Sequence, residues 1–90
     1  MISYDPLWNT MKNRGITKYQ LIYHWGISSN TIRRIGHGEA ISSSTLNELC
    51  LILNCKVQDI LQFDATVEEL EEINLRKEEI NNFRKKKRKK

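Results

Sequence analysis

A pattern of residue types recurs three times in the first half of this sequence and limits the folds available to it. Each copy has an apolar residue, a Ser or Thr, three further residues and a second apolar residue, as in Ile16-Thr17…Leu21, Ile27-Ser28…Ile32 and Ile41-Ser42…Leu46. A hydroxyl in this position accepts hydrogen bonds from unpaired N–H groups at a helix start, and the two apolar residues pack together across the first turn. The pattern therefore predicts three helix starts, and Gln20 completes a capping box in the first.

Proline and glycine indicate the remaining helix boundaries. Asp5-Pro6 predicts the start of a first helix, because proline suits the first helical position. Gly15, Gly26 and either Gly36 or Gly38 predict helix ends, because glycine tolerates the left-handed conformation that follows a helix. We therefore predict short helices at about residues 6–14, 17–25, 28–36, 43–53 and 57–62, the last with a poor cap. No run alternates with period two for long enough to predict a strand.

The apolar residues of these helices predict one shared core. The positions expected to face it are Leu7, Trp8, Met11, Leu21, Ile22, Trp25, Ile32, Ile35, Leu46, Leu49, Leu53 and Ile60. Ninety residues, 39% hydrophobic and 29% charged, suit one soluble domain with a polar extension. The fold class expected is a compact all-α domain over residues 1–65.

The last 25 residues differ in composition from this domain. Residues 66–83 hold six glutamates, and apolar residues recur there at spacings of three and seven, at Leu70, Ile73, Ile80 and Phe83. This spacing predicts one long amphipathic helix. The helix packs back on its own domain, pairs antiparallel with a second copy, or is disordered, and the sequence leaves these alternatives open. Residues 84–90, RKKKRKK, carry seven basic groups and no acid, which predicts a flexible tail.

The second and third predicted helices are joined only by Gly26 and Ile27. So short a link favours a steep crossing, as in the helix-turn-helix unit. At about 100° per residue, Ile32 and Ile35 lie on the inward side of helix 28–36. The opposite side gathers polar and basic residues, namely Asn30, Arg33, Arg34 and His37, with Ser29 at its margin.

These side chains are of the kinds that read DNA. Asn pairs with adenine, Arg with guanine and Ser with either base in the major groove. Lys18 lies beside the exposed N–H groups of the preceding helix, which favours a phosphate contact. Basic residues also concentrate in the first three predicted helices, at Lys12, Arg14, Lys18, Arg33 and Arg34. The pattern predicts a positive, DNA-facing side.

Residues 17–61, TKYQLIYHWGISSNTIRRIGHGEAISSSTLNELCLILNCKVQDIL, resemble the Cro and lambda-repressor type (XRE-type) helix-turn-helix family. With YDPLWNTMKNRG as a first helix, the resemblance covers about two-thirds of the chain. Matching positions are Leu21, Gly26, Ile32, Ile35 and Gly38. Two departures are Ile22, where the family usually has a small residue at the helix crossing, and Gly36, where the third helix would often continue.

The resemblance implies a five-helix lambda-repressor-like domain and a set of DNA contacts. The base-reading positions that it implies are Ser29, Asn30, Arg33 and Arg34. The positions assigned to phosphate are Lys18, Ser28, Thr31 and His37, of which Thr31 also suits a base methyl and His37 lies in a loop. We expect a sequence-specific transcriptional regulator, a repressor that binds double-stranded DNA as a homodimer. Its recognition helices would enter successive major grooves of a partly palindromic operator, about 34 Å apart.

Other classes of function are less favoured by the sequence. No carboxylate pair, nucleophile–base arrangement or phosphate loop is visible, so we expect neither an enzyme nor a cofactor. Cys50 and Cys55 lack ligand spacing and are expected as buried thiols in a reduced compartment. The longest apolar run, Leu49 to Leu53, is too short to span a membrane, and Met1 opens no signal peptide, so we expect a cytoplasmic, nucleoid-associated protein.

The sequence leaves two rival functions open. An antitoxin-like or adaptor protein would bind a protein partner through helix 66–83 and touch DNA only secondarily. An RNA-binding module would rely on the basic tail. That tail, residues 84–90, either adds phosphate contacts without sequence information or only solubilises the chain.

Overall fold

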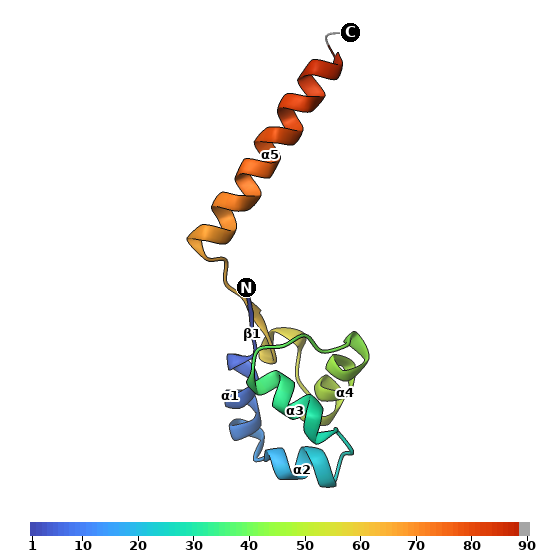
Figure 1. Ribbon diagram of the computed structural model, residues 1–90. Coiled ribbons are helices and arrows are strands. Elements are labelled where there is room, and N and C mark those ends of the chain that lie inside the picture. The colour runs from blue at the N-terminus through green and yellow to red at the C-terminus, as the bar shows by residue number, and fades with distance from the viewer. Residues whose placement is uncertain (89–90) are drawn as a thin grey trace.

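The computed structural model describes the backbone of residues 1–88 and the side chains of residues 1–84. Its elements are β1 (Ile2–Ser3), α1 (Asp5–Arg14), α2 (Lys18–Tyr23), α3 (Ser29–Gly36), α4 (Ser43–Leu53), the 3-10 turn η1 (Val57–Asp59), β2 (Gln62–Phe63) and α5 (Val67–Arg88). Helices α1 to α4 pack into one domain, and α5 extends away from it as a single rod (Figure 1). The molecule is therefore elongated, with extents of 63 × 23 × 22 Å.

The predicted helix starts are confirmed by their hydrogen bonds. Thr17 Oγ1 accepts from the Gln20 N–H at 3.2 Å, and Gln20 Oε1 accepts from the Thr17 N–H at 2.9 Å, which completes the capping box. Ser28 and Ser42 each accept, through Oγ, the N–H three residues further on at 3.1 Å. Since each such cap contributes about 1 kcal/mol, these hydroxyls fix where α2, α3 and α4 begin.

The core lies between α1, α2, α3 and α4, as the apolar spacing predicts. Its most buried side chains are Leu7, Leu21, Leu49, Leu53 and Ile60, each at most 1% exposed. Met11, Ile32 and Ile35 are buried with them, while Trp8, Ile22 and Leu46 pack partly buried against the cluster. Ile22 is thus accommodated at the crossing of α2 by leaving part of its side chain outside the core.

The turn between α2 and α3 is longer than predicted, and one expected core residue is wrong. Helix α2 ends at Tyr23, and both the His24 and Trp25 N–H groups bond to the Gln20 carbonyl, which stops the helical ladder. Trp25 therefore lies in the turn, 54% exposed, and is not a core residue. Ile27, which is 4% exposed, is the residue of this turn that enters the core, and its N–H group bonds to the Leu21 carbonyl.

Two further differences concern the ends of the domain. The fifth predicted helix, 57–62, is only the 3-10 turn η1, consistent with its poor cap. The chain then forms β2, which pairs antiparallel with β1 in the register Ile2↔Phe63 and Ser3↔Gln62. Two residues per strand are too few for period two to appear, so the sequence does not predict this pairing. The fold is otherwise the expected all-α domain.

Helix α5 begins with a second capping box. The Glu69 carboxylate accepts from the Thr66 N–H at 3.0 Å, and Thr66 Oγ1 accepts from the Glu69 N–H at 3.1 Å. The Thr66 N–H bond, together with a bond from the Met1 amine, lowers the pKa of Glu69 from its ordinary value. These contacts join the start of α5 to the start of the chain.

The other end of α5 differs from the sequence expectation. The sequence predicts that the helix stops at residue 83, but it continues through Arg88, into the segment expected to be a flexible tail. Lysine and arginine are good helix formers, and positive charge near a helix C-terminus interacts favourably with the helix dipole. Residues 89 and 90, the rest of the expected tail, lie outside the described residues.

Candidate nucleic-acid interface

Helix α3 has one buried and one exposed side. Ile32 and Ile35 point into the core, at 7% and 2% exposure. The four residues predicted to read bases are all exposed on this helix, namely Ser29, Asn30, Arg33 and Arg34. The structure therefore brings these side chains together on the outer face of the second helix of the pair.

The N-terminal end of α3 carries a hydroxyl pair. Ser28 Oγ and Thr31 Oγ1 lie 2.8 Å apart, in addition to the capping bond from the Thr31 N–H to Ser28. One hydroxyl proton is shared between the two oxygens, so one hydroxyl proton is left to donate outward. That donor, at a helix N-terminus, suits a phosphate oxygen.

Asn30 and Arg33 form a polar cluster with Glu39. Asn30 Oδ1 accepts from Arg33 Nε at 3.2 Å and from Arg33 Nη2 at 2.8 Å. Arg33 Nη1 lies 3.8 Å from Glu39 Oε2, and both side chains are about half exposed. Arg33 is thus held in place from two sides before any ligand binds.

Arg34 differs from its neighbour. Within residues 1–84, no hydrogen bond or ion pair engages its exposed guanidinium. Its backbone carbonyl accepts from the His37 and Glu39 N–H groups and fixes the loop that follows the helix. All five donors of the side chain are therefore available to an incoming ligand.

Lys18 begins α2, and its ammonium lies over α1. Lys18 Nζ is 4.7 Å from the centre of the Trp8 ring, a cation–π contact worth roughly 0.5–1 kcal/mol at an exposed site. Lys18 is the first residue of α2, the end of the helix at which N–H groups favour a phosphate. Figure 1 shows α2 at the end of the domain farthest from α5.

His37 lies just beyond α3, as its C-terminal cap, and is exposed. Helix α3 continues through Gly36, so that glycine does not shorten it. Gly38 carries the left-handed backbone instead, with φ +72°. His37 is therefore placed in the loop, about one turn beyond the guanidinium-bearing residues.

Glu39 is a residue that sequence reasoning missed. It pairs with Arg33, and its backbone carbonyl accepts from the Tyr4 hydroxyl at 2.9 Å. Its spacing of six from Arg33 is not a helical pairing distance, so no local pattern marks it. The only signal in the sequence is that Glu39 is the one acidic residue near Arg33 and Arg34.

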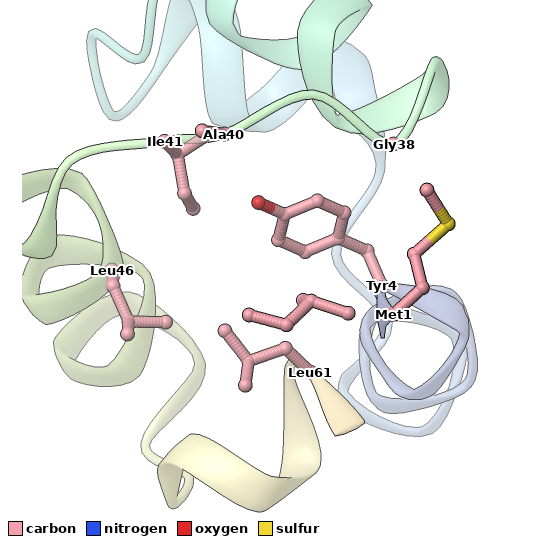
Figure 2. Close-up of a pocket in the computed structure, with 8 residues that line it drawn as sticks. Met1, Tyr4, Gly38, Ala40, Ile41, Leu46 and Leu61 are labelled. Carbon is pink, nitrogen blue, oxygen red and sulfur yellow. The ribbon is translucent and has the colours of Figure 1, made fainter. Parts of the chain in front are cut away.

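A pocket of about 320 Å³ lies behind the loop that carries Glu39. Figure 2 shows Tyr4 reaching into it from the start of the chain, opposite Ile41 and Leu46. The residues that line it are Met1, Ile2, Tyr4, Gly38, Ala40, Ile41, Leu46 and Leu61. The Tyr4 hydroxyl is the one side-chain oxygen or nitrogen in that set, and it donates to the Glu39 carbonyl.

Cys50 and Cys55 are free, half-buried thiols. Burial raises the pKa of Cys55, with the neighbouring Cys50 adding to the effect. Among the described residues no group of three His, Cys, Asp or Glu could hold a metal ion. Over the same part of the chain, each helix is too short or too polar to cross a membrane.

Known proteins share this architecture. No protein of curated function matches the chain. The crystal structure of the transcriptional regulator VanUg, in its Form II, matches with a TM-score of 0.63 and 33% sequence identity, over 68% of this chain and 81% of that one. The Cro/C1-type HTH DNA-binding domain family matches residues 6–66, which include the exposed face of α3 and every buried core residue except Tyr4. The chain belongs to the Cro/C1-type helix-turn-helix DNA-binding family.

Proposed function

We propose that this protein is a sequence-specific transcriptional repressor that binds a partly palindromic operator as a dimer. The observation that carries the proposal is the exposed face of α3, where Ser29, Asn30, Arg33 and Arg34 lie together. VanUg, which is similar over most of its length, is a transcriptional regulator. Occupying promoter DNA with the whole domain would block the promoter without any enzymatic step.

Each part of the face has a role in this proposal. Arg33 and Arg34 read base edges in the major groove, with Ser29 and Asn30 beside them. Lys18 and the hydroxyl pair at the start of α3 bind phosphates on either side and set the docking angle. His37, in the loop after α3, meets a further phosphate.

Selection of bound fragments from a random duplex pool tests this function. We expect an enriched motif whose two halves are related by two-fold symmetry. The Arg33→Ala/Arg34→Ala double variant, with the same fold, is the control and should enrich no motif. Wild-type protein that retains duplexes without enriching any sequence would contradict sequence-specific binding.

Helix α5 is our candidate for the dimer contact. Its apolar stripe is exposed in the monomer, at 51% for Leu70, 46% for Ile73, 52% for Ile80 and 63% for Phe83. The first turns of the helix are acidic and its last turns are basic. Antiparallel pairing places the acidic turns of one copy beside the basic turns of the other, and at the same time pairs the two stripes.

Such a dimer has a consequence for the operator. Two antiparallel α5 helices place their DNA-binding domains at opposite ends of the pair. The 22 residues of α5 extend about 33 Å, and this length separates the two domains of the pair. Each domain occupies the rest of the 63 Å length of its own chain, so the two recognition helices lie more than one turn of DNA apart. We therefore expect half-sites two turns apart, about 68 Å, instead of the single turn expected from the sequence.

Sedimentation equilibrium with a matched pair of variants tests the contact. Ile73→Asp places a charge within the stripe, whereas Leu75→Asp places the same charge on the other side of α5, where Leu75 is 61% exposed. We expect Ile73→Asp to produce monomers and Leu75→Asp to leave the dimer intact. Equal dimerisation of both variants would show that another surface, such as the late helices of the domain, makes the contact.

The same exposed stripe favours the adaptor function as the second candidate. An adaptor predicts a tight complex with a different protein, bound through α5, that survives loss of both Arg33 and Arg34. An RNA-binding module predicts instead that single-stranded RNA outcompetes duplex DNA at equal salt. Competition binding therefore separates all three functions.

A further inference from the structure

The hydrogen bonds of Asn30 bear on which base this protein reads. Adenine is recognised by an Asn side chain that accepts from N6 and donates to N7 at the same time. In this structure Asn30 Oδ1 already accepts two hydrogen bonds from Arg33, at 3.2 and 2.8 Å. A carbonyl oxygen has two lone pairs, so this acceptor is filled.

What remains exposed on this pair is a set of donors. Arg33 uses its Nε and Nη2 edge for Asn30, which leaves the edge formed by Nη1 and the second hydrogen of Nη2. Asn30 retains only its amide N–H groups. Guanine presents two acceptors, O6 and N7, in the major groove, whereas adenine presents one acceptor and one donor. The pair therefore complements guanine.

Arg33 also has an acidic neighbour, at an ion-pair distance that leaves the hydrogens of its Nη1/Nη2 edge without a hydrogen-bond partner. Glu39 Oε2 lies 3.8 Å from Nη1, and the backbone of Glu39 is fixed by the Tyr4 hydroxyl, which donates to its carbonyl, and by its own N–H bond to the Arg34 carbonyl. Two partners thus limit the rotamers of a long side chain before DNA arrives. Less entropy is lost when a held side chain binds, and the carboxylate weakens the attraction of Arg33 for phosphates in general.

We infer that Asn30 is a positioning residue for Arg33 and that the two residues read one guanine as a unit, with Glu39 as a counter-charge that favours base over phosphate contact. This inference rests on the proposed function. It differs from the independent reading expected from the sequence, in which Asn30 pairs with adenine and Arg33 with guanine separately.

Selection from a random duplex pool, with variants run in parallel, tests the inference. Wild-type protein should enrich guanine at the position read by the pair. Arg33→Ala releases Asn30 Oδ1, so the preference at that position should change from guanine to adenine. Arg33→Lys keeps the charge but lacks the two-pronged edge, and should show the same change.

Affinities for the selected site provide a second measurement. Asn30→Ala should lower the preference for guanine by about 5- to 150-fold, the size of one bidentate contact. Adding Asn30→Ala to Arg33→Ala should cost little more guanine discrimination, because the pair is already broken. Glu39→Gln should tighten binding to random duplexes more than to the selected site, which lowers the preference for that site, and should steepen the salt dependence.

The outcomes separate this inference from the proposed function. Wild-type protein that enriches adenine at a position of its own, with that preference lost in Asn30→Ala but kept in Arg33→Ala, would overturn the coupled pair. The pair would also be overturned if the loss of guanine preference in the double variant equalled the product of the losses in the two single variants. A wild-type protein that enriches no motif would instead refute sequence-specific binding as a whole. All four substitutions are at exposed positions, and circular dichroism melting verifies that each variant is folded.

Discussion

Replacing Arg34 by alanine isolates a single base contact. The guanidinium is exposed and, over residues 1–84, makes no hydrogen bond or ion pair that its loss would break. The backbone carbonyl of Arg34, which holds the following loop, is kept by alanine. Since alanine is also the better helix former, we expect the unfolding free energy to change by less than about 0.5 kcal/mol.

The effect on binding is expected to be larger. A good bidentate contact between Arg and guanine contributes about 1–3 kcal/mol of discrimination. The Kd for the selected operator should therefore rise by about 5- to 150-fold at fixed salt. Arg34→Lys keeps the charge but not the fork, so it should retain binding to random duplex while losing most of the preference at one base pair.

Fluorescence anisotropy at two or more salt concentrations measures both effects. The expected result is a loss confined to the selected duplex, with one blurred base position. A loss of equal size for selected and random duplexes, with the log–log salt slope reduced by about 0.9, would mean that Arg34 contacts a phosphate. Base reading by this residue would then be refuted.

Helix caps and the basic end of the chain can be tested in the same way. Ser28→Ala removes the N-cap of α3 and should lower stability by about 0.5–2 kcal/mol, hence Tm by several degrees, whereas Ser29→Ala should leave Tm nearly unchanged in the same thermal melt. The Thr66 N–H bond lowers the pKa of Glu69 below its ordinary value of 4.5. The stabilisation that the Glu69 carboxylate provides as a cap is therefore fully present above pH 4.5 and is lost as the pH falls through the lowered pKa. A ¹³C titration of the Glu69 carboxyl group measures this pKa, and a midpoint at or above 4.5 would contradict the prediction. Measured on duplexes with a single half-site, where dimer pairing through α5 plays no part, deleting residues 84–90 should weaken binding to selected and random sequences alike and flatten the salt dependence; a loss restricted to the selected sequence would argue against phosphate contacts by this segment.

Much of the candidate interface can be predicted from the sequence. Ser28 indicates where the helix begins, and the spacing of Ile32 and Ile35 indicates which side of it is buried. These two features are enough to place Arg33 and Arg34 on the exposed side. The coupling within that face cannot be predicted in this way. Whether Asn30 points to DNA or to Arg33 depends on rotamers, and the contribution of Glu39 depends on a loop that Tyr4 anchors from 35 residues away.

The sequence alone determined where the helices begin and which sides of them are apolar, because caps and periodicity are local properties of a few consecutive residues. Only the tertiary structure decided that Ile27 instead of Trp25 enters the core, and that β1 pairs with β2. It also showed α5 standing away from the domain, with its apolar stripe exposed. These outcomes depend on which distant segments meet, and contacts between distant segments leave no fixed spacing in the chain.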